Sequence, residues 1–276
     1  MTTGNWLPTG KIKEAAEGKI LSIESGHTGW LVFNNPERRN AMSRAMWDAV
    51  PELIANLEAN SDIKALVLMG AGEKAFISGA DISEFKEQRE RPEAEDQYRA
   101  ATEAAWGAIE ASRLPTVAMI RGACMGGGLA TALSCDIRIA SEDATFAIPA
   151  AKLGIGYPFA GIQKLVALLG PAQAKAMMFT AEAYSAGTAH TIGLINEVTG
   201  AEKLELRVRE LTDAMARNAP LTIEAAKLSI DQAVKDAGAR DMDRVQQAID
   251  RAMNSDDVKE GHQAFLEKRA PDFKGR

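Results

Sequence analysis

The sequence has 276 residues, 46% of them hydrophobic and 25% charged, so it can bury one large core and has the charge content of an ordinary globular protein. A formal net charge of −6 argues against a nucleic-acid-binding surface, and the two cysteines and three histidines lack metal-ligand spacing. No run approaches the roughly 18 apolar residues of a membrane span, and residues 1–19 do not resemble a signal peptide. We therefore expect a cytoplasmic protein with no membrane or nucleic-acid partner.

The first half of the chain alternates strand and helix patterns. Residues 19–35 predict two short strands around a glycine turn, and residues 43–60 predict a helix with one apolar stripe. Further segments continue the alternation: strands at 64–70, within 74–85, at 116–120 and at 136–140, and a helix at 98–114. Residues 84–97 are rich in charge and predict a solvated loop or helix end. The alternation predicts an α/β fold with parallel strands and βαβ crossovers.

From about residue 160 the patterns become helical throughout, with breaks at Gly170–Pro171 and at Pro220. The chain thus divides into an N-terminal extension over 1–17, an α/β core over 18–200 and a helical C-terminal region over 201–276. We expect the C-terminal helices to form an oligomerisation surface.

A triple glycine, Gly126-Gly127-Gly128, ends one predicted strand and opens a short helix. The first N–H groups of a helix have no partner within it, so such a turn can hold a phosphate or an oxygen that becomes negative during a reaction. The phosphate-loop and dinucleotide patterns do not fit, since Thr131 stands where the last glycine of the latter is required. Tight packing of helix against strand is the alternative explanation of the glycines.

A second glycine turn, "SGADI" at 78–82, also follows a predicted strand and exposes the N–H group of Ala80. Two such turns in one α/β core could supply the two N–H donors of an oxyanion hole. This arrangement suits a thioester carbonyl whose oxygen becomes an enolate oxygen.

Five segments resemble, in order, landmarks of the crotonase (enoyl-CoA hydratase/isomerase) superfamily: "PERRNAMS" (36–43), "AFISGADISEF" (75–85), "MGGGLATALSCDIRIAS" (125–141), "FTAEAYSAGTAHTIGLINEV" (179–198) and "EGHQAFLEKRAPDF" (260–273). The resemblance runs from about residue 18 to the end. It implies a ββα spiral core, a C-terminal helical trimerisation region and a homotrimer or dimer of trimers. It also implies an acyl-CoA thioester as ligand in the core and no cofactor beyond the coenzyme A moiety of the substrate.

The same resemblance assigns site residues. The oxyanion hole would consist of the N–H groups of Ala80 and Gly127. The acyl group and coenzyme A would be contacted by further residues, the last two from a neighbouring subunit: Asp81, Ile82, Trp106, Ala130, Ala150, Phe265 and Lys268.

The chain departs from the family pattern at two positions. Hydratases of the family carry one glutamate two residues after the triple glycine and another after a proline twenty residues on, where this chain has Ala130 and Ala150. Water addition needs a base and an acid, and a methyl group can be neither. Isomerases usually keep the second acid, so that reaction is also disfavoured. Tyr157-Pro158-Phe159 replaces small residues of the family and should reshape the pocket.

Tyr157 is the first candidate for a catalytic proton carrier, because it lies in the stretch that lines the acyl site; a packing role with its hydroxyl bonded to the backbone is the alternative. Glu103 lies one turn before Trp106 and is a second candidate if it faces the pocket; a solvated position on the helix surface is the alternative. Bracing positions are expected for Asp81 and Asp136, and surface positions for His27 and His262. Ser78 lacks the G-x-S-x-G context of a catalytic nucleophile.

Three hypotheses follow. The first is an acyl-CoA enzyme that relies on the oxyanion hole alone or on an acid from another segment; decarboxylation of a malonyl-type thioester is the simplest case, and retro-aldol, hydrolytic and isomerase reactions stay open. The second is an ordinary enoyl-CoA hydratase of fatty or aromatic acid degradation that uses another acid. The third is a non-catalytic protein that binds CoA thioesters.

Overall fold

The computed structural model describes residues 7–81 and 92–276, and every structural statement below concerns these residues. They form strands β1 (Lys11–Ala15), β2 (Ile20–Ser25), β3 (Thr28–Phe33), β4 (Ala65–Gly70), β5 (Ala75–Ile77), β6 (Thr116–Ile120), β7 (Ala123–Met125), β8 (Ile137–Ser141), β9 (Thr145–Ala147), β10 (Tyr184–Ser185) and β11 (Glu197–Thr199). The α-helices are α1 (Arg44–Ala59), α3 (Pro92–Ala111), α4 (Gly127–Leu133), α5 (Ala150–Leu153), α6 (Phe159–Thr180), α7 (Ala186–Thr191), α8 (Leu204–Ala216), α9 (Pro220–Ala233), α10 (Met242–Met253) and α11 (Asp256–Glu267). Two 3₁₀ turns complete the described elements, η1 (Pro36–Arg38) and η2 (Ala237–Ala239).

The strands form two sheets that wind together as a spiral. The larger sheet has the order β1-β2-β3-β4-β6-β8-β11, and the smaller has the order β10-β9-β7-β5. The strands β4, β6 and β8 pair in parallel in the large sheet, and each is followed at once by a parallel strand of the small sheet, β5, β7 or β9. This repetition is the predicted ββα spiral of the crotonase-like α/β fold, and it brings the ends of β5 and β7 to neighbouring positions.

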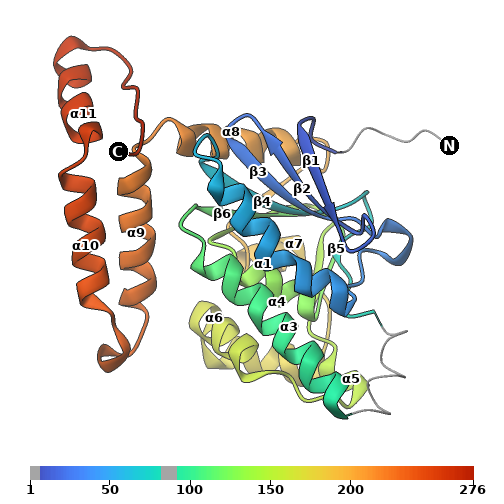
Figure 1. Ribbon diagram of the computed structural model, residues 1–276. Helices are drawn as coiled ribbons and strands as arrows, with labels where there is room; N and C mark the ends of the chain where they lie inside the picture. The colour runs from blue at the N-terminus through green and yellow to red at the C-terminus, as the bar shows by residue number, and fades with distance from the viewer. Residues whose placement is uncertain (1–6, 82–91) are drawn as a thin grey trace.

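Both faces of the large sheet are covered. Helix α8 packs on one face, where Leu204 and Val208 join an apolar cluster with Trp30. Helices α1 and α3 cover the other face (Figure 1). The predicted stripe of α1 is confirmed, because its four members are all at most 1% exposed: Met46, Val50, Leu53 and Leu57. Apolar side chains are therefore buried on both faces of the large sheet.

Three local features differ from the sequence-based expectation. Residues 11–15, within the predicted N-terminal extension, form strand β1 and pair antiparallel with β2. Helix α3 begins at Pro92, six residues before the predicted start, inside the stretch expected to be a loop or helix end. Strands β7 and β9 have only three residues each and are not predicted from the sequence. Short strands carry too few residues for periodicity to reveal them.

Helices α9, α10 and α11 form an arm at the side of the core (Figure 1). Lys227 of α9 ties this arm to the core: its Nζ lies 2.9 Å from an Asp136 carboxylate oxygen and donates to the carbonyl oxygen of Leu114 at 3.0 Å. The Asp257 carboxylate in turn accepts the N–H groups of Lys274 and Gly275, which fixes the C-terminal tail on α11. Within residues 7–81 and 92–276, no helix has the length and apolar character needed to cross a bilayer.

Candidate active site

The two glycine turns predicted from the sequence lie side by side. Strand β5 pairs in parallel with β7, with Ile77 opposite Cys124. A Cβ atom on Gly128 would lie 2.4 Å from the carbonyl oxygen of Ile77, so helix α4 can start this close to β5 only with a glycine at that position. The packing explanation of the triple glycine is therefore correct for Gly128.

The other two glycines of the triplet have different constraints. Gly126 has φ 53° and ψ −115°, a conformation that residues with a side chain rarely adopt. Gly127 has no such requirement, since a Cβ there would meet only the ring of Trp47, at 3.5 Å, which is ordinary contact. Neither strain nor packing within the described chain demands glycine at 127, which leaves the approach of a ligand to its backbone as a physical reason for it.

The N–H groups of Ala80 and Gly127 are both available at these turns. The chain around Ala80 pairs with Met42, whose N–H donates to Gly79 and whose carbonyl oxygen accepts from Asp81, each at 2.9 Å. Because successive N–H groups of an extended chain alternate in direction, that of Ala80 faces away from Met42. Gly127 is the first residue of α4, where the N–H has no intrahelical partner. Neither N–H donates to an acceptor within the described residues, and both residues are partly exposed.

Two indole rings stand next to Gly127. Trp106 of α3 donates from Nε1 to the hydroxyl of Thr131 at 3.1 Å, and that hydroxyl donates to the carbonyl oxygen of Gly127 at 2.8 Å. Trp47 of α1 meets Trp106 edge to face, with ring centroids 6.3 Å apart, and donates to the hydroxyl of Tyr98 at 2.9 Å. Trp47 was not predicted as a site residue, because the sequence does not distinguish it from its buried neighbours on α1.

The methyl groups of Ala130 and Ala150 lie in the same apolar cluster. Ala130 is fully buried in α4, and Ala150 is the first residue of α5, with 8% exposed. The cluster also contains Leu129, next to Ala130, and Ile148, two residues before Ala150, and both are fully buried. The surroundings are therefore apolar at both positions, and a carboxylate introduced there would lose hydration.

Tyr157 lies against the glycine turn. Its hydroxyl donates to the carbonyl oxygen of Gly126 at 3.2 Å, and burial raises the pKa of the phenol above its usual value. The side chain is therefore a neutral hydrogen-bond donor at physiological pH, with its proton directed at the backbone. Both roles considered for Tyr157 place it at this turn, and its hydrogen bond matches the packing role.

The chain is similar to known proteins over most of its length. The family model described as enoyl-CoA hydratase/isomerase matches residues 28–276. The chain belongs to this family. Among its relatives, the short-chain-enoyl-CoA hydratase of Clostridium acetobutylicum is 32% identical over 93% of this chain and 98% of the relative. The peroxisomal Δ(3,5)-Δ(2,4)-dienoyl-CoA isomerase of Arabidopsis thaliana is 31% identical over 88% of this chain and 91% of the relative.

The fold comparison agrees. A crystal structure of an enoyl-CoA hydratase/carnitine racemase from Magnetospirillum magneticum superimposes with a TM-score of 0.88 and 28% identity, covering 94% of this chain and 96% of that one. The relatives of this enoyl-CoA hydratase/isomerase family member thus include both hydratases and an isomerase, so family membership leaves the reaction of this chain unspecified.

The remaining predicted residues fall into three groups. Asp81 lies 3.0 Å from Arg38 through both carboxylate oxygens, and Asp136 accepts from the N–H and hydroxyl of Thr116, so both brace turns as expected. Ile82 lies outside the described residues. The other polar candidates are exposed or bonded elsewhere: Glu103 and His262 are exposed, His27 lies 2.8 Å from Asp213, and the hydroxyl of Ser78 donates to the carbonyl oxygen of Arg38.

Phe265 and Lys268 lie at the end of α11, on the arm, and are not brought to the glycine turns by their own chain (Figure 1). Phe265 is 83% exposed. Lys268 ends the helix in the left-handed conformation, with φ 54°. If these residues contact a ligand at the glycine turns, that ligand is bound by another copy of the chain.

The two cysteines are buried free thiols, as predicted. Burial raises the pKa of Cys135 to about 12 and also raises that of Cys124. Both thiols therefore stay protonated at neutral pH, which leaves them without the thiolate that nucleophilic or metal-binding cysteines need.

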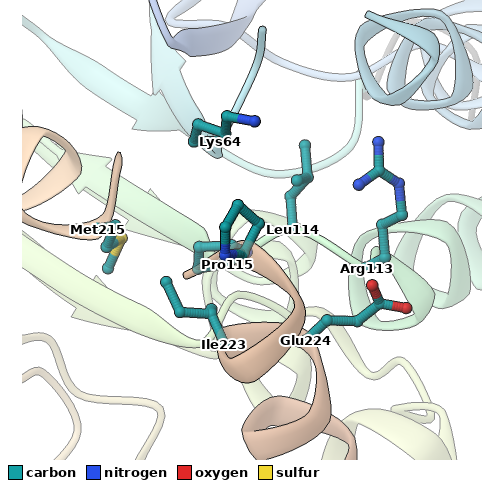
Figure 2. A pocket seen from close by; sticks show the side chains of 8 residues that line it. Lys64, Arg113, Leu114, Pro115, Met215, Ile223 and Glu224 are labelled. Atoms are coloured by element: carbon teal, nitrogen blue, oxygen red, sulfur yellow. The ribbon is translucent and has the colours of Figure 1, made fainter. Parts of the chain in front are cut away.

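A small pocket lies apart from the glycine turns, where the arm joins the core. Figure 2 shows Leu114 and Pro115 of the core facing Met215 and Ile223 at the α8–α9 connection. Its cavity volume is about 10 Å³, which is room for about one water molecule. An acyl-CoA does not fit in such a space, so the pocket belongs to the joint between arm and core.

Proposed function

We propose that this protein is an acyl-CoA enzyme that stabilises a thioester enolate between the N–H groups of Ala80 and Gly127. One observation carries the proposal: two partly exposed N–H donors with no acceptor in the described chain stand on adjacent turns, β5 to Ala80 and β7 to α4. An oxyanion held by two such donors is worth on the order of 3 kcal/mol per donor in the transition state.

The reaction follows from what the site lacks. Hydration needs a base to activate water and an acid to protonate the α-carbon, and Ala130 and Ala150 supply neither at the family's two glutamate positions. Decarboxylation of a malonyl-type thioester needs only the oxyanion hole. The bond between the α-carbon and the carboxylate breaks, its electron pair moves into the thioester to form the enolate, carbon dioxide leaves, and the α-carbon then takes a proton from water.

The apolar surroundings favour the same reaction. A carboxylate placed beside the methyl groups of Ala130 and Ala150 loses hydration, whereas the carbon dioxide that it becomes is uncharged. The ground state is thereby raised relative to the product, and the negative charge moves toward the two N–H donors.

A substrate comparison tests this proposal. We expect carbon dioxide release from malonyl-CoA or methylmalonyl-CoA and crotonyl-CoA hydration well below the median enzyme turnover of about 10 per second. Ala130→Glu together with Ala150→Glu should raise hydration, whereas Ala151→Glu, on the exposed side of α5, is the matched control and should not. Wild-type hydration at about 10 per second would assign the ordinary hydratase function instead.

Two further outcomes separate the remaining hypotheses. Binding of CoA esters by calorimetry without turnover of any of the three substrates would identify a non-catalytic binder. No affinity for any CoA ester would remove the proposal altogether.

For assembly, we propose a homotrimer or dimer of trimers built through the arm. Large apolar side chains on α9 and α10 stay exposed in the single chain, among them Ile230 at 64% and Met253 at 65%. Exposed apolar surface of this kind marks an interaction site. In such an assembly, Phe265 and Lys268 of one subunit would reach the coenzyme A bound by the next. Light scattering tests this, and a monomer at micromolar concentration would contradict it.

A further inference from the structure

The hydrogen bond of Tyr157 ends on one peptide group that also carries a donor of the proposed oxyanion hole. The carbonyl oxygen of Gly126 accepts the Tyr157 hydroxyl at 3.2 Å, and the N–H on the other end of that same peptide group belongs to Gly127. The N–H of Ala130 donates to this oxygen as well, at 3.1 Å. The oxygen thus has two donors, one from helix α4 and one from the stretch before α6.

Donors on the carbonyl of a peptide group strengthen its N–H as a donor. Resonance across the C–N bond moves electron density from nitrogen to oxygen, and a hydrogen bond at the oxygen favours that form. Successive hydrogen bonds polarise each other by perhaps 10–30% per bond. The phenol of Tyr157 therefore makes the N–H of Gly127 more positive.

The same hydrogen bond fixes the direction of that N–H. The peptide plane between Gly126 and Gly127 is set by a glycine at φ 53° and ψ −115°, which has no side chain to restrict its rotation. A second donor on the carbonyl, from outside the helix, opposes rotation of this plane. An N–H that is aimed before the substrate arrives costs no reorganisation during the reaction.

The surroundings of Tyr157 hold its ring for this contact. Gly161, on the first turns of α6, faces the ring so closely that a Cβ atom there would lie 2.6 Å from Cε1 of Tyr157. Burial keeps the phenol protonated, and a protonated phenol is required to donate. The glycine at 161 and the tyrosine at 157 thus fit each other sterically.

We infer that Tyr157 is a positioning residue of the oxyanion hole, acting through the Gly126–Gly127 peptide group rather than by transferring a proton to or from the substrate. The inference rests on the proposed function, because it requires a thioester oxygen at the N–H of Gly127. It differs from the role of proton carrier, since the hydroxyl proton is used in the bond to the Gly126 carbonyl oxygen.

The test measures the bound thioester itself. Butyryl-CoA labelled with ¹³C at the thioester carbonyl is bound to the wild-type protein and to Tyr157→Phe, and the carbonyl resonance is compared with that of the free ligand. In the wild type we expect a downfield shift, because N–H donors polarise the carbonyl. In Tyr157→Phe the shift should shrink by about 10–30%. The turnover number on malonyl-CoA or methylmalonyl-CoA should fall about two- to fivefold with little change in KM, less than the 10²–10³-fold loss from removing an oxyanion donor outright.

Two further variants make the result specific. Tyr184→Phe, on β10, removes a hydroxyl from another partly buried tyrosine and should leave the resonance and the turnover unchanged. Gly161→Ala keeps the phenol but displaces its ring, so it should reduce both quantities as Tyr157→Phe does. If Tyr157→Phe does not fold, Gly161→Ala alone decides the question.

The outcomes separate this inference from the proposed function. A full wild-type shift and turnover in Tyr157→Phe or, where that variant does not fold, in Gly161→Ala would overturn the role of Tyr157 and leave the oxyanion hole standing. A bound wild-type complex without any downfield shift would instead remove the oxyanion hole. An equal loss of turnover at all pH values supports positioning, whereas loss of one limb of the pH–rate profile in Tyr157→Phe would assign proton transfer to the phenol.

Discussion

The glycine turns and the C-terminal arm differ in how far one chain determines them. At the turns, contacts within the chain constrain Gly126, Gly128, Ala80 and Tyr157, and the surrounding core buries Trp47 and Phe76 to 1% or less. On the arm, the buried cluster consists of three alanines, Ala225, Ala248 and Ala252, with two partly buried leucines. The geometry of the glycine turns is therefore a property of the single chain, whereas the arm leaves apolar surface that a partner can cover.

Gly128→Ala tests whether the glycine turns depend on contacts within the chain. The new methyl group would lie 2.4 Å from the carbonyl oxygen of Ile77, which is backbone and cannot move aside cheaply. We expect a loss of about 3 kcal/mol in the free energy of unfolding, at the upper end of overpacking effects, together with loss of CoA-ester binding. Urea unfolding and calorimetry measure the two quantities.

Gly127→Ala is the matched control for stability. Its methyl group would meet only the Trp47 ring, at 3.5 Å, so the free energy of unfolding should change by less than about 1 kcal/mol. The methyl group would nevertheless stand at the proposed oxyanion site and reduce turnover. Equal destabilisation by the two substitutions would contradict the assignment of packing to Gly128 and of ligand approach to Gly127.

A smaller effect is expected where the two regions meet. Lys227→Met removes the ammonium that lies 2.9 Å from Asp136, and with it the bond to the carbonyl oxygen of Leu114. The lysine side chain is 10% exposed and that of Asp136 is 29% exposed, so the loss should be about 2 kcal/mol, below the roughly 3–5 kcal/mol of a fully buried pair. Hydrogen exchange should rise in α9 and leave the glycine turns unchanged.

Lys259→Met is the control for the loss of stability expected in Lys227→Met. Lys259 lies 3.1 Å from Asp256 on α11, with both side chains at least 70% exposed, so its loss should change stability by less than about 0.5 kcal/mol. Faster exchange at the glycine turns in Lys227→Met would contradict their independence from the arm.

The sequence predicts the elements with strong local periodicity. The stripe of α1, the break at Gly170–Pro171 and the two glycine turns are predicted correctly, because each depends on neighbouring residues alone. At the break, Gly170 interrupts α6 with the non-helical angles φ 74° and ψ 166°. Strand β1 was assigned to an extension because its residues, "KIKEA", are charged and exposed at the edge of the sheet, so that burial leaves no apolar pattern.

Contacts between distant residues could not be predicted in the same way. The hydroxyl of Tyr157 meets a carbonyl oxygen 31 residues earlier, and the Trp47 ring lies beside a glycine on another helix. Periodicity places Trp47 on the buried side of α1 but says nothing about what it touches there. Such contacts depend on the tertiary arrangement of elements, which local patterns do not specify.

The smallest expected effect concerns the charge of Asp231 on α9, which interacts with charged groups of the core. Burial raises the pKa of this carboxyl, and Asp136 and Glu110 of the core raise it further, while Lys227 and Lys235 oppose the shift. A folded-state pKa above the usual 3.8 means that the group stabilises the fold below pH 3.8 and that this contribution is lost as the pH rises through the folded pKa. The ionised carboxylate of Asp231 therefore lowers the stability of the fold at neutral pH.

Asp231→Asn removes this titration and keeps the shape of the side chain. Relative to the wild type, the thermal midpoint of the variant should rise as the pH is raised from about 3.5 to 7, because only the wild type loses a favourable proton over that range. Asp143→Asn, in the exposed turn between β8 and β9, gives the effect of the same substitution away from the arm. An advantage of Asp231→Asn that grows toward low pH would have the wrong sign for a desolvated carboxyl and would contradict the raised pKa of Asp231.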